Sequence, residues 1–144
     1  MAQKSVTIDV TLGSTFVIES DIRGHKVVID QPSTGGGTDA GPTPLELLFA
    51  SLGGCIGTIS RLIAMQKQIE LRGMKIKVEG DIDTDGLLGK PIEGRMGLEG
   101  ITISVEMDAD LSDEEKIAFL HEVDARCPVS DNLLNATPVG IQLA

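Results

Sequence analysis

The sequence predicts an α+β fold made of antiparallel strands and two main helices. Residues 4–12 and 101–107 alternate apolar and polar side chains, as half-buried strands do. Residues 45–70 instead repeat apolar side chains with helical spacing. The order strands, helix, strands, helix indicates α+β rather than βαβ architecture. We expect a single domain over residues 1–144, because chains of this length usually form one core of roughly 100–200 residues.

Three strands are expected before the first helix. Val6, Ile8, Val10 and Leu12 lie on one face of the first strand, which should be half-buried. Two shorter apolar segments, 16–18 and 26–29, follow after turns at 13–14 and 23–24. These segments predict a three-stranded meander. The Gly- and Pro-rich residues 31–44 then connect it to the helix.

The first helix has an unusual number of interior glycines. Pro44 suits its first turn, where a fixed φ and a missing N–H cost nothing. Gly53, Gly54 and Gly57 each lower helix stability by about 1 kcal/mol relative to alanine. The compensating gain that we expect is close approach of a second helix or a second subunit.

The C-terminal half should contain two strands, a helix and a last strand. Residues 74–78 and 101–107 alternate as strands joined by a long hairpin connection. Ser112 and Glu115 have the spacing of a capping box. The helix that they start should end at Cys127, since Pro128 disfavours helix for the residue before it. Residues 139–143 are expected to form the last strand.

Charge and composition exclude several classes of function. The 22 acidic and 12 basic residues give a net charge of −10, which opposes binding to nucleic acid or to an anionic membrane. We expect no membrane span, because a span needs an apolar run of roughly 18–20 residues and we expect none of that length. We also expect no signal peptide, because the first residues lack an apolar core. The protein is therefore expected in the cytoplasm, where permanent disulfides are uncommon.

Neither a metal nor another cofactor is expected. His25 and His121 are isolated and lack ligand spacing to the cysteines. The segment 81–86 matches the first half of a calcium loop, but Ile92 stands where a bidentate Glu is required. An acidic turn is the simpler interpretation.

Cys55 and Cys127 are the only cysteines, and we take them as a candidate redox pair. On a helix, the hydroxyl groups of Ser51 and Thr58 share a face with Cys55 and could donate a hydrogen bond to its thiolate. Burial of Cys55 as a small hydrophobic residue is an equally good interpretation. Cys127, at a helix C-terminus, would have its thiolate opposed by the macrodipole, which suits a resolving thiol. Core packing remains the alternative for Cys127.

A reactive cysteine needs a cationic partner. An ordinary cysteine is only about 3% ionised at pH 7. One guanidinium at about 4 Å stabilises a thiolate by roughly 4 kcal/mol. This exceeds the ~2.7 kcal/mol needed to lower the pKa of a thiol by about two. The sequence leaves five candidates open: Arg23, Arg61, Arg72, Arg95 and Arg126. Because there is no Cys-x-x-Cys motif, disulfide exchange is the least favoured activity for this pair.

The two cysteine contexts together resemble the OsmC/Ohr family of thiol-dependent peroxidases. Pro44 lies eleven residues before Cys55, small residues precede that cysteine, and Cys127 begins the sequence Cys-Pro-Val-Ser. The order of strands and helices fits the family over nearly the whole chain. The resemblance implies an OsmC-like fold, with antiparallel sheets around a long buried central helix, and an intertwined homodimer.

The resemblance also implies an activity. Cys55 would attack an organic hydroperoxide or hydrogen peroxide and become a sulfenic acid. Cys127 would then form a disulfide with it, and an external dithiol would reduce that disulfide. Glu46 and Arg23 are the implied partners of the thiolate, although the best-known members carry the Glu ten residues before the cysteine and Glu46 stands nine before it. The alternative is a non-catalytic dimeric module that binds a small apolar ligand on the same scaffold.

Overall fold

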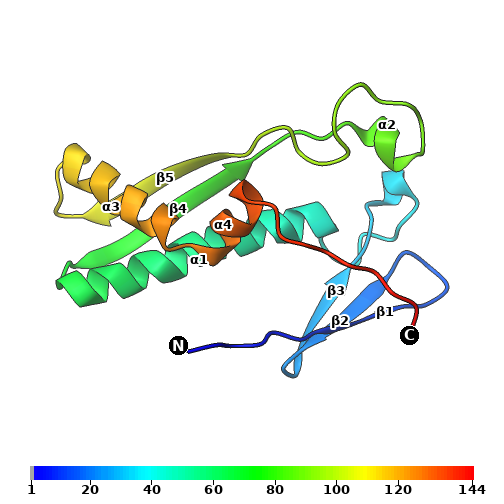
Figure 1. The fold of residues 1–144 in the computed structure, drawn as a ribbon, viewed down its shortest axis with the longest axis horizontal. Coiled ribbons are helices and arrows are strands. Elements are labelled where there is room, and N and C mark those ends of the chain that lie inside the picture. The colour runs from blue at the N-terminus through cyan, green and yellow to red at the C-terminus, as the bar shows by residue number, and fades with distance from the viewer. Residues whose placement is uncertain (1) are drawn as a thin grey trace. The chain divides into compact units, whose positions relative to one another are not determined.

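The structure, a computed structural model, describes residues 2–144 and confirms the α+β class (Figure 1). Antiparallel sheets lie before and after the long helix α1, as the sequence predicted. The chain divides into two compact units, residues 1–48 and 49–144. The expectation of one domain over residues 1–144 stays a prediction.

The first unit contains the predicted three-stranded meander. Its antiparallel strands are β1 (Asp9–Leu12), β2 (Ile18–Ile22) and β3 (His25–Ile29), paired in that order. Arg23 and Gly24 make the two-residue turn between β2 and β3, both with positive φ, 55° and 84°. Two positive φ values match the twist of a tight hairpin, and glycine adopts them without strain.

The expected burial of the first strand is wrong for this chain. Val6, Ile8, Val10 and Leu12 have exposed fractions between 47% and 80%. β1 pairs with β2 along one edge, but an alternating pattern is buried only where a second layer covers its apolar face. That covering layer is not provided within the first unit.

A buried carboxylate organises the connection between β3 and α1. Asp30 is fully buried and accepts hydrogen bonds from the amides of Gln31, Thr38 and Ala40 and from the Thr38 hydroxyl. Chiefly the Ala40 amide, then the Thr38 hydroxyl, lower the pKa of Asp30 to about 2. Within this connection, residues Ser33–Gly35 form the single 3₁₀ turn η1.

Helix α1 (Pro44–Lys67) runs through its three glycines without a break and buries one face. The buried residues are Leu52, Ile56, Ser60, Ile63 and Ala64. By length and composition α1 could cross a membrane, with a mean hydropathy of 1.6, so the expectation that no apolar run reaches that length is wrong. The core helix of a water-soluble protein passes the same test, and one face of α1 indeed packs into a protein core.

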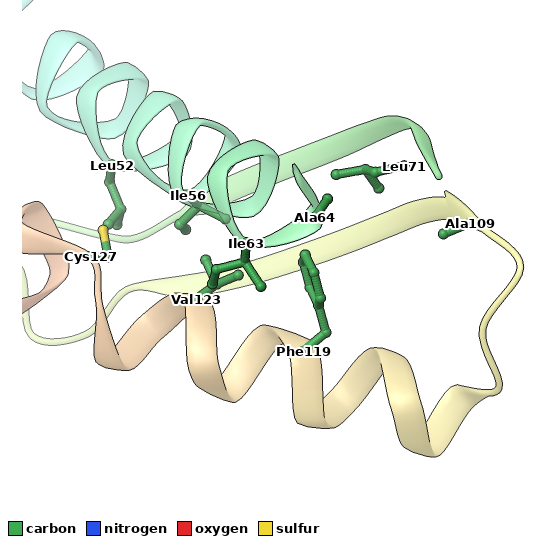
Figure 2. Packing of buried hydrophobic residues seen from close by; sticks show 9 residues of the cluster. All are labelled: Leu52, Ile56, Ile63, Ala64, Leu71, Ala109, Phe119, Val123 and Cys127. Atoms are coloured by element: carbon green, nitrogen blue, oxygen red, sulfur yellow. The ribbon is translucent and has the colours of Figure 1, made fainter. Parts of the chain in front are cut away.

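The second unit packs α1 and α3 against a two-stranded sheet. Strands β4 (Leu71–Glu79) and β5 (Thr102–Ala109) are antiparallel, and the short helix α2 (Thr84–Leu87) lies in their connection. Helix α3 (Asp113–Ala125) begins with the predicted capping box between Ser112 and Glu115. Figure 2 shows the core that these elements enclose: Leu52, Ile56, Ile63, Ala64, Leu71, Ala109, Phe119, Val123 and Cys127.

The C-terminal end differs from the prediction. Helix α4 (Pro128–Leu134) starts directly after Cys127. The expected last strand is wrong, because residues 139–143 form no regular element and the side chains of Val139, Ile141 and Leu143 are 85–101% exposed. A strand needs a neighbour to satisfy its backbone N–H and C=O groups, and within residues 2–144 these residues pair with no strand.

Candidate active site

The structure brings the two cysteine sulfurs together, although 72 positions separate the residues in sequence. Cys55 lies on α1, and Cys127 lies at the junction of α3 and α4. The Cys127 thiol donates to the Cys55 sulfur over 2.9 Å, and both cysteines are free. This separation is only about 0.9 Å longer than an S–S bond of roughly 2.05 Å, so a disulfide needs little movement.

The two thiols differ in their access to solvent. Cys127 belongs to the buried core and is only 1% exposed, whereas Cys55 is half-buried. Figure 2 shows the Cys127 side chain pointing toward α1. Ile59 and Val129 pack against the same cluster. The pair therefore lies in apolar surroundings, with Cys55 as the more accessible sulfur.

Cys127 lies just after the end of α3, as predicted, but it also begins a second helix that the prediction did not place there. Helix α3 ends at Ala125, and Cys127 is the N-cap residue of α4, with Pro128 at the first helical position. Proline favours this position because its φ is already helical. The sulfur consequently accepts a hydrogen bond from the Ser130 amide, 3.4 Å away. The local backbone thus supports negative charge on Cys127 and does not oppose it.

Burial nevertheless makes the Cys127 thiol a weaker acid than an ordinary cysteine. Burial raises the pKa of Cys127, and the hydrogen bond that its thiol donates to Cys55 raises it further. The Ser130 amide acts in the opposite direction and lowers the pKa. A protonated Cys127 suits a thiol that reacts second, after its partner sulfur has been oxidised.

Ser130 and Asp124 lie beside Cys127 and were not found from the sequence. Ser130 is 7% exposed, and its hydroxyl donates to the Asp124 carboxylate over 2.6 Å. The hydrogen bond joins the last turn of α3 to the first turn of α4. The one sequence signal for this hydrogen bond is a serine two residues after a proline at a helix start. That signal does not show that Asp124 accepts the bond.

The hydroxyl groups expected to support Cys55 are engaged or exposed. Thr58 Oγ1 donates to the Gly54 carbonyl over 2.8 Å, one turn back along α1. This is the usual bond of a threonine within a helix. Ser51 is exposed on the same helix. The expected hydrogen bond from Thr58 to Cys55 is therefore absent from this structure of residues 2–144.

Glu46 caps the start of α1. Its carboxylate accepts from the Thr43 amide over 2.7 Å, and the Thr43 hydroxyl accepts from the Glu46 amide over 3.4 Å. These reciprocal bonds form a capping box, which the Thr-x-x-Glu spacing contains but which we had not predicted. A helix turns about 900° over nine residues, so Glu46 and Cys55 point to opposite sides of α1. The catalytic role of Glu46 stays a prediction.

Three of the five arginines have their guanidinium groups bound elsewhere. Arg61 donates to the Leu71 carbonyl, and Arg126 donates to side chains of Gln66 and Glu122. Arg72 binds two aspartates, Asp108 and Asp110.

Arg23 and Arg95 remain as candidates for the thiolate partner. Arg23 is exposed in the β2–β3 turn of the first unit, and Arg95 is exposed in the connection between α2 and β5.

Residues 2–144 contain no group of three or more His, Cys, Asp and Glu side chains arranged to hold a metal ion. In the segment 81–86, the Asp83 carboxylate accepts from the Asp85 amide and so caps α2. These residues form an acidic helix start.

Comparison with known proteins identifies the family. Residues 36–142 match the family model described as OsmC-like protein. The chain belongs to the OsmC-like family. No curated protein matches the sequence of this OsmC-like chain.

Solved structures of the family have the same fold at low sequence identity. An OsmC-like protein from Mycoplasma pneumoniae is 24% identical with a TM-score of 0.81, covering 94% of this chain and 91% of that one. An organic hydroperoxide resistance protein OsmC from Legionella pneumophila is 19% identical with a TM-score of 0.70, covering 92% and 91%. The organic hydroperoxide resistance protein OhrB of Bacillus subtilis is 22% identical with a TM-score of 0.65, covering 94% of each chain. The resemblance noted from the two cysteine contexts is thereby confirmed.

Proposed function

We propose that this OsmC-like protein is a thiol peroxidase that reduces organic hydroperoxides in defence against oxidative stress. The single observation that carries the proposal is the 2.9 Å separation of the Cys55 and Cys127 sulfurs. Two solved relatives, from Legionella pneumophila and Bacillus subtilis, are described as organic hydroperoxide resistance proteins. The chemistry needs only the two thiols and no cofactor.

Cys55 reacts first because it is the more accessible sulfur. Its thiolate donates an electron pair to the outer oxygen of the hydroperoxide. An S–O bond forms, the O–O bond breaks, and the alkoxide takes a proton and leaves as an alcohol. Cys55 is oxidised to a sulfenic acid and the hydroperoxide is reduced.

Cys127 then resolves the sulfenic acid. Its sulfur donates an electron pair to the Cys55 sulfur, an S–S bond forms, and the S–O bond breaks. The oxygen leaves as water with the Cys127 proton. The 2.9 Å between the sulfurs is already slightly shorter than the roughly 3–3.5 Å that favours reaction between bound groups.

An external dithiol restores the reduced protein. Attack on the Cys55 sulfur is favoured, since Cys127 is only 1% exposed. Cys127 leaves as a thiolate and takes a proton. The second thiol of the reductant then displaces Cys55, so the reductant ends as a cyclic disulfide and both cysteines end as thiols.

We assign activation of Cys55 to Arg23, with Glu46 as the carboxylate partner of that guanidinium. Arg61, Arg72 and Arg126 are bound elsewhere, which leaves Arg23 and Arg95, and the family resemblance favours Arg23. To take this role, the Glu46 carboxylate must give up the hydrogen bond from the Thr43 amide and bind the Arg23 guanidinium instead. The helix start retains the Thr43 hydroxyl as a cap during that exchange.

The functional unit in this proposal is an intertwined homodimer, in which the central helices are buried against each other. Leu62 and Met65 on α1 are 43% and 69% exposed, and a methyl group added at Gly54 would meet no atom within 4 Å. A second copy would cover these residues, the exposed apolar strand near the start of the chain and the exposed apolar residues 139–143. Met65→Glu should then shift sedimentation toward the monomer, while the similarly exposed Leu87→Glu should not. A monomeric wild-type protein contradicts this assembly.

The apolar surroundings of the cysteines favour organic hydroperoxides over hydrogen peroxide as substrates. We expect wild-type protein to consume cumene hydroperoxide continuously when a dithiol such as dihydrolipoamide is supplied. Cys55→Ser should abolish consumption, and Cys127→Ser should stop at a Cys55 sulfenic acid that dimedone traps. Absence of consumption by wild type with any dithiol refutes the proposal. A cytoplasmic location stays a prediction.

A non-catalytic apolar-ligand module is the second candidate. A cavity of about 360 Å³ between α1 and β4 supports it, with a lining of small and apolar residues: Phe49, Ala50, Gly53, Gly54, Ile76 and Val78. The rate of Cys55 alkylation by iodoacetamide at pH 7 distinguishes the two functions. A peroxidase cysteine should react faster than free cysteine, whereas a packing cysteine should react more slowly.

A further inference from the structure

Ser130 directs both of its polar groups toward the junction that holds Cys127. Its amide donates to the Cys127 sulfur over 3.4 Å, and its hydroxyl donates to Asp124 Oδ1 over 2.6 Å. The residue is 7% exposed, so its hydroxyl has little access to water as an alternative partner. A buried hydroxyl that bonds to a carboxylate is a strong, directional contact.

This contact joins the two helices on either side of Cys127. Asp124 lies in the last turn of α3, and Ser130 lies in the first turn of α4. The backbone adds two bonds at the same place, from the Cys127 amide to the Asp124 carbonyl and from the Asp131 amide to the Cys127 carbonyl. The side-chain bond between Ser130 and Asp124 spans the junction from helix to helix and ties the first turn of α4, which carries the Ser130 amide, to the last turn of α3.

We propose that Ser130 and Asp124 are positioning residues that hold the Cys127 sulfur against Cys55 for the disulfide-forming step. The inference rests on the proposed role of Cys127 as the resolving thiol. Reaction between bound groups is steep in distance, and a misplacement of about 1 Å can cost roughly a hundredfold in rate. Loss of a single supporting hydrogen bond should displace the sulfur by less than that and slow the step about tenfold.

The test measures the disulfide-forming step without peroxide. The reagent dithiobis(nitrobenzoate) first converts the accessible Cys55 to a mixed disulfide and releases one thionitrobenzoate. The Cys127 sulfur then attacks the Cys55 sulfur. The Cys55–Cys127 bond forms, the bond to the reagent breaks, and a second thionitrobenzoate leaves while the Cys127 proton goes to solvent. Cys127→Ser releases only the first equivalent and so defines the first step.

Ser130→Ala and Asp124→Ala should each slow the second release about tenfold and leave the first release unchanged. The double variant should be no slower than either single variant, because both substitutions remove the same hydrogen bond between Ser130 and Asp124. Ser130→Thr keeps the hydroxyl and Asp124→Asn keeps an acceptor, so both should stay within about twofold of wild type. Ser112→Ala is the matched control, since it removes a serine that caps α3 at its distant end.

A wild-type rate of second release in Ser130→Ala overturns the inference. So does an equal slowing in Ser112→Ala, which would indicate a general loss of helix stability. Because the assay uses a disulfide reagent, it stays informative if the protein reduces no peroxide. Failure of peroxide consumption with intact second release would refute the proposed function alone.

Discussion

Oxidation of the cysteine pair should stabilise the fold by a predictable amount. The bond would close a loop of 72 residues, and the chain-entropy argument assigns such a loop a stabilisation of about 4 kcal/mol. The full amount is expected only if the native fold forms the bond without distortion. The 2.9 Å approach of the free sulfurs supports that condition. For a chain of this size, about 4 kcal/mol corresponds to a rise in Tm of roughly 8–16 °C.

Thermal unfolding of the oxidised and the reduced protein at one protein concentration measures this difference. Equal concentration matters because any dimer makes Tm depend on concentration. Cys127→Ser, which cannot form the bond, should unfold at the same temperature under both conditions. An oxidised wild-type protein that melts at or below the reduced one refutes the reasoning, because strain would then offset the loss of chain entropy.

Three further predictions concern single residues. Arg23→Gln should slow oxidation of Cys55 by cumene hydroperoxide at least tenfold in stopped-flow measurements, whereas Arg95→Gln should not. The reverse result would show that Arg95, and not Arg23, activates Cys55. Asp30→Asn should lower Tm at pH 7, and the difference from wild type should shrink between about pH 4 and pH 2, because a folded pKa of about 2 stabilises only while the carboxylate stays ionised. A constant difference across that range contradicts this account. Gly37→Ala should destabilise by about 1–3 kcal/mol in urea unfolding because its methyl group would lie 2.0 Å from a backbone oxygen, while Gly35→Ala, with no atom nearer than 3.6 Å, should change stability by less than about 0.5 kcal/mol.

Local patterns predicted most of the elements. The alternation in residues 101–107 gave β5, and the Ser112–Glu115 spacing gave the start of α3, because both signals come from residues that are neighbours in the chain. The pairing of Cys55 with Cys127 depended on a resemblance between two cysteine contexts. No rule of periodicity could bring together residues 72 positions apart.

The errors arose where a contact decides between local options. Residues 139–143 have a strand pattern, but a strand requires a pairing partner, and the part of the chain that the structure describes supplies none. Pro128 predicts the end of the helix before it, yet it is also the first residue of the next helix, because a proline suits a first helical position as well. The bonds of Asp30 and of Ser130 were missed for the same reason, since their partners are fixed only when the loop or junction folds.

The most direct test of the redox pair is the chemical state of its two sulfurs after one equivalent of cumene hydroperoxide. Intact-protein mass spectrometry under alkylating quench should find wild type lighter by two hydrogen atoms, with Cys55 and Cys127 joined in one peptide pair. Two alkylated thiols and unconsumed hydroperoxide would contradict the proposal that this site reduces peroxides.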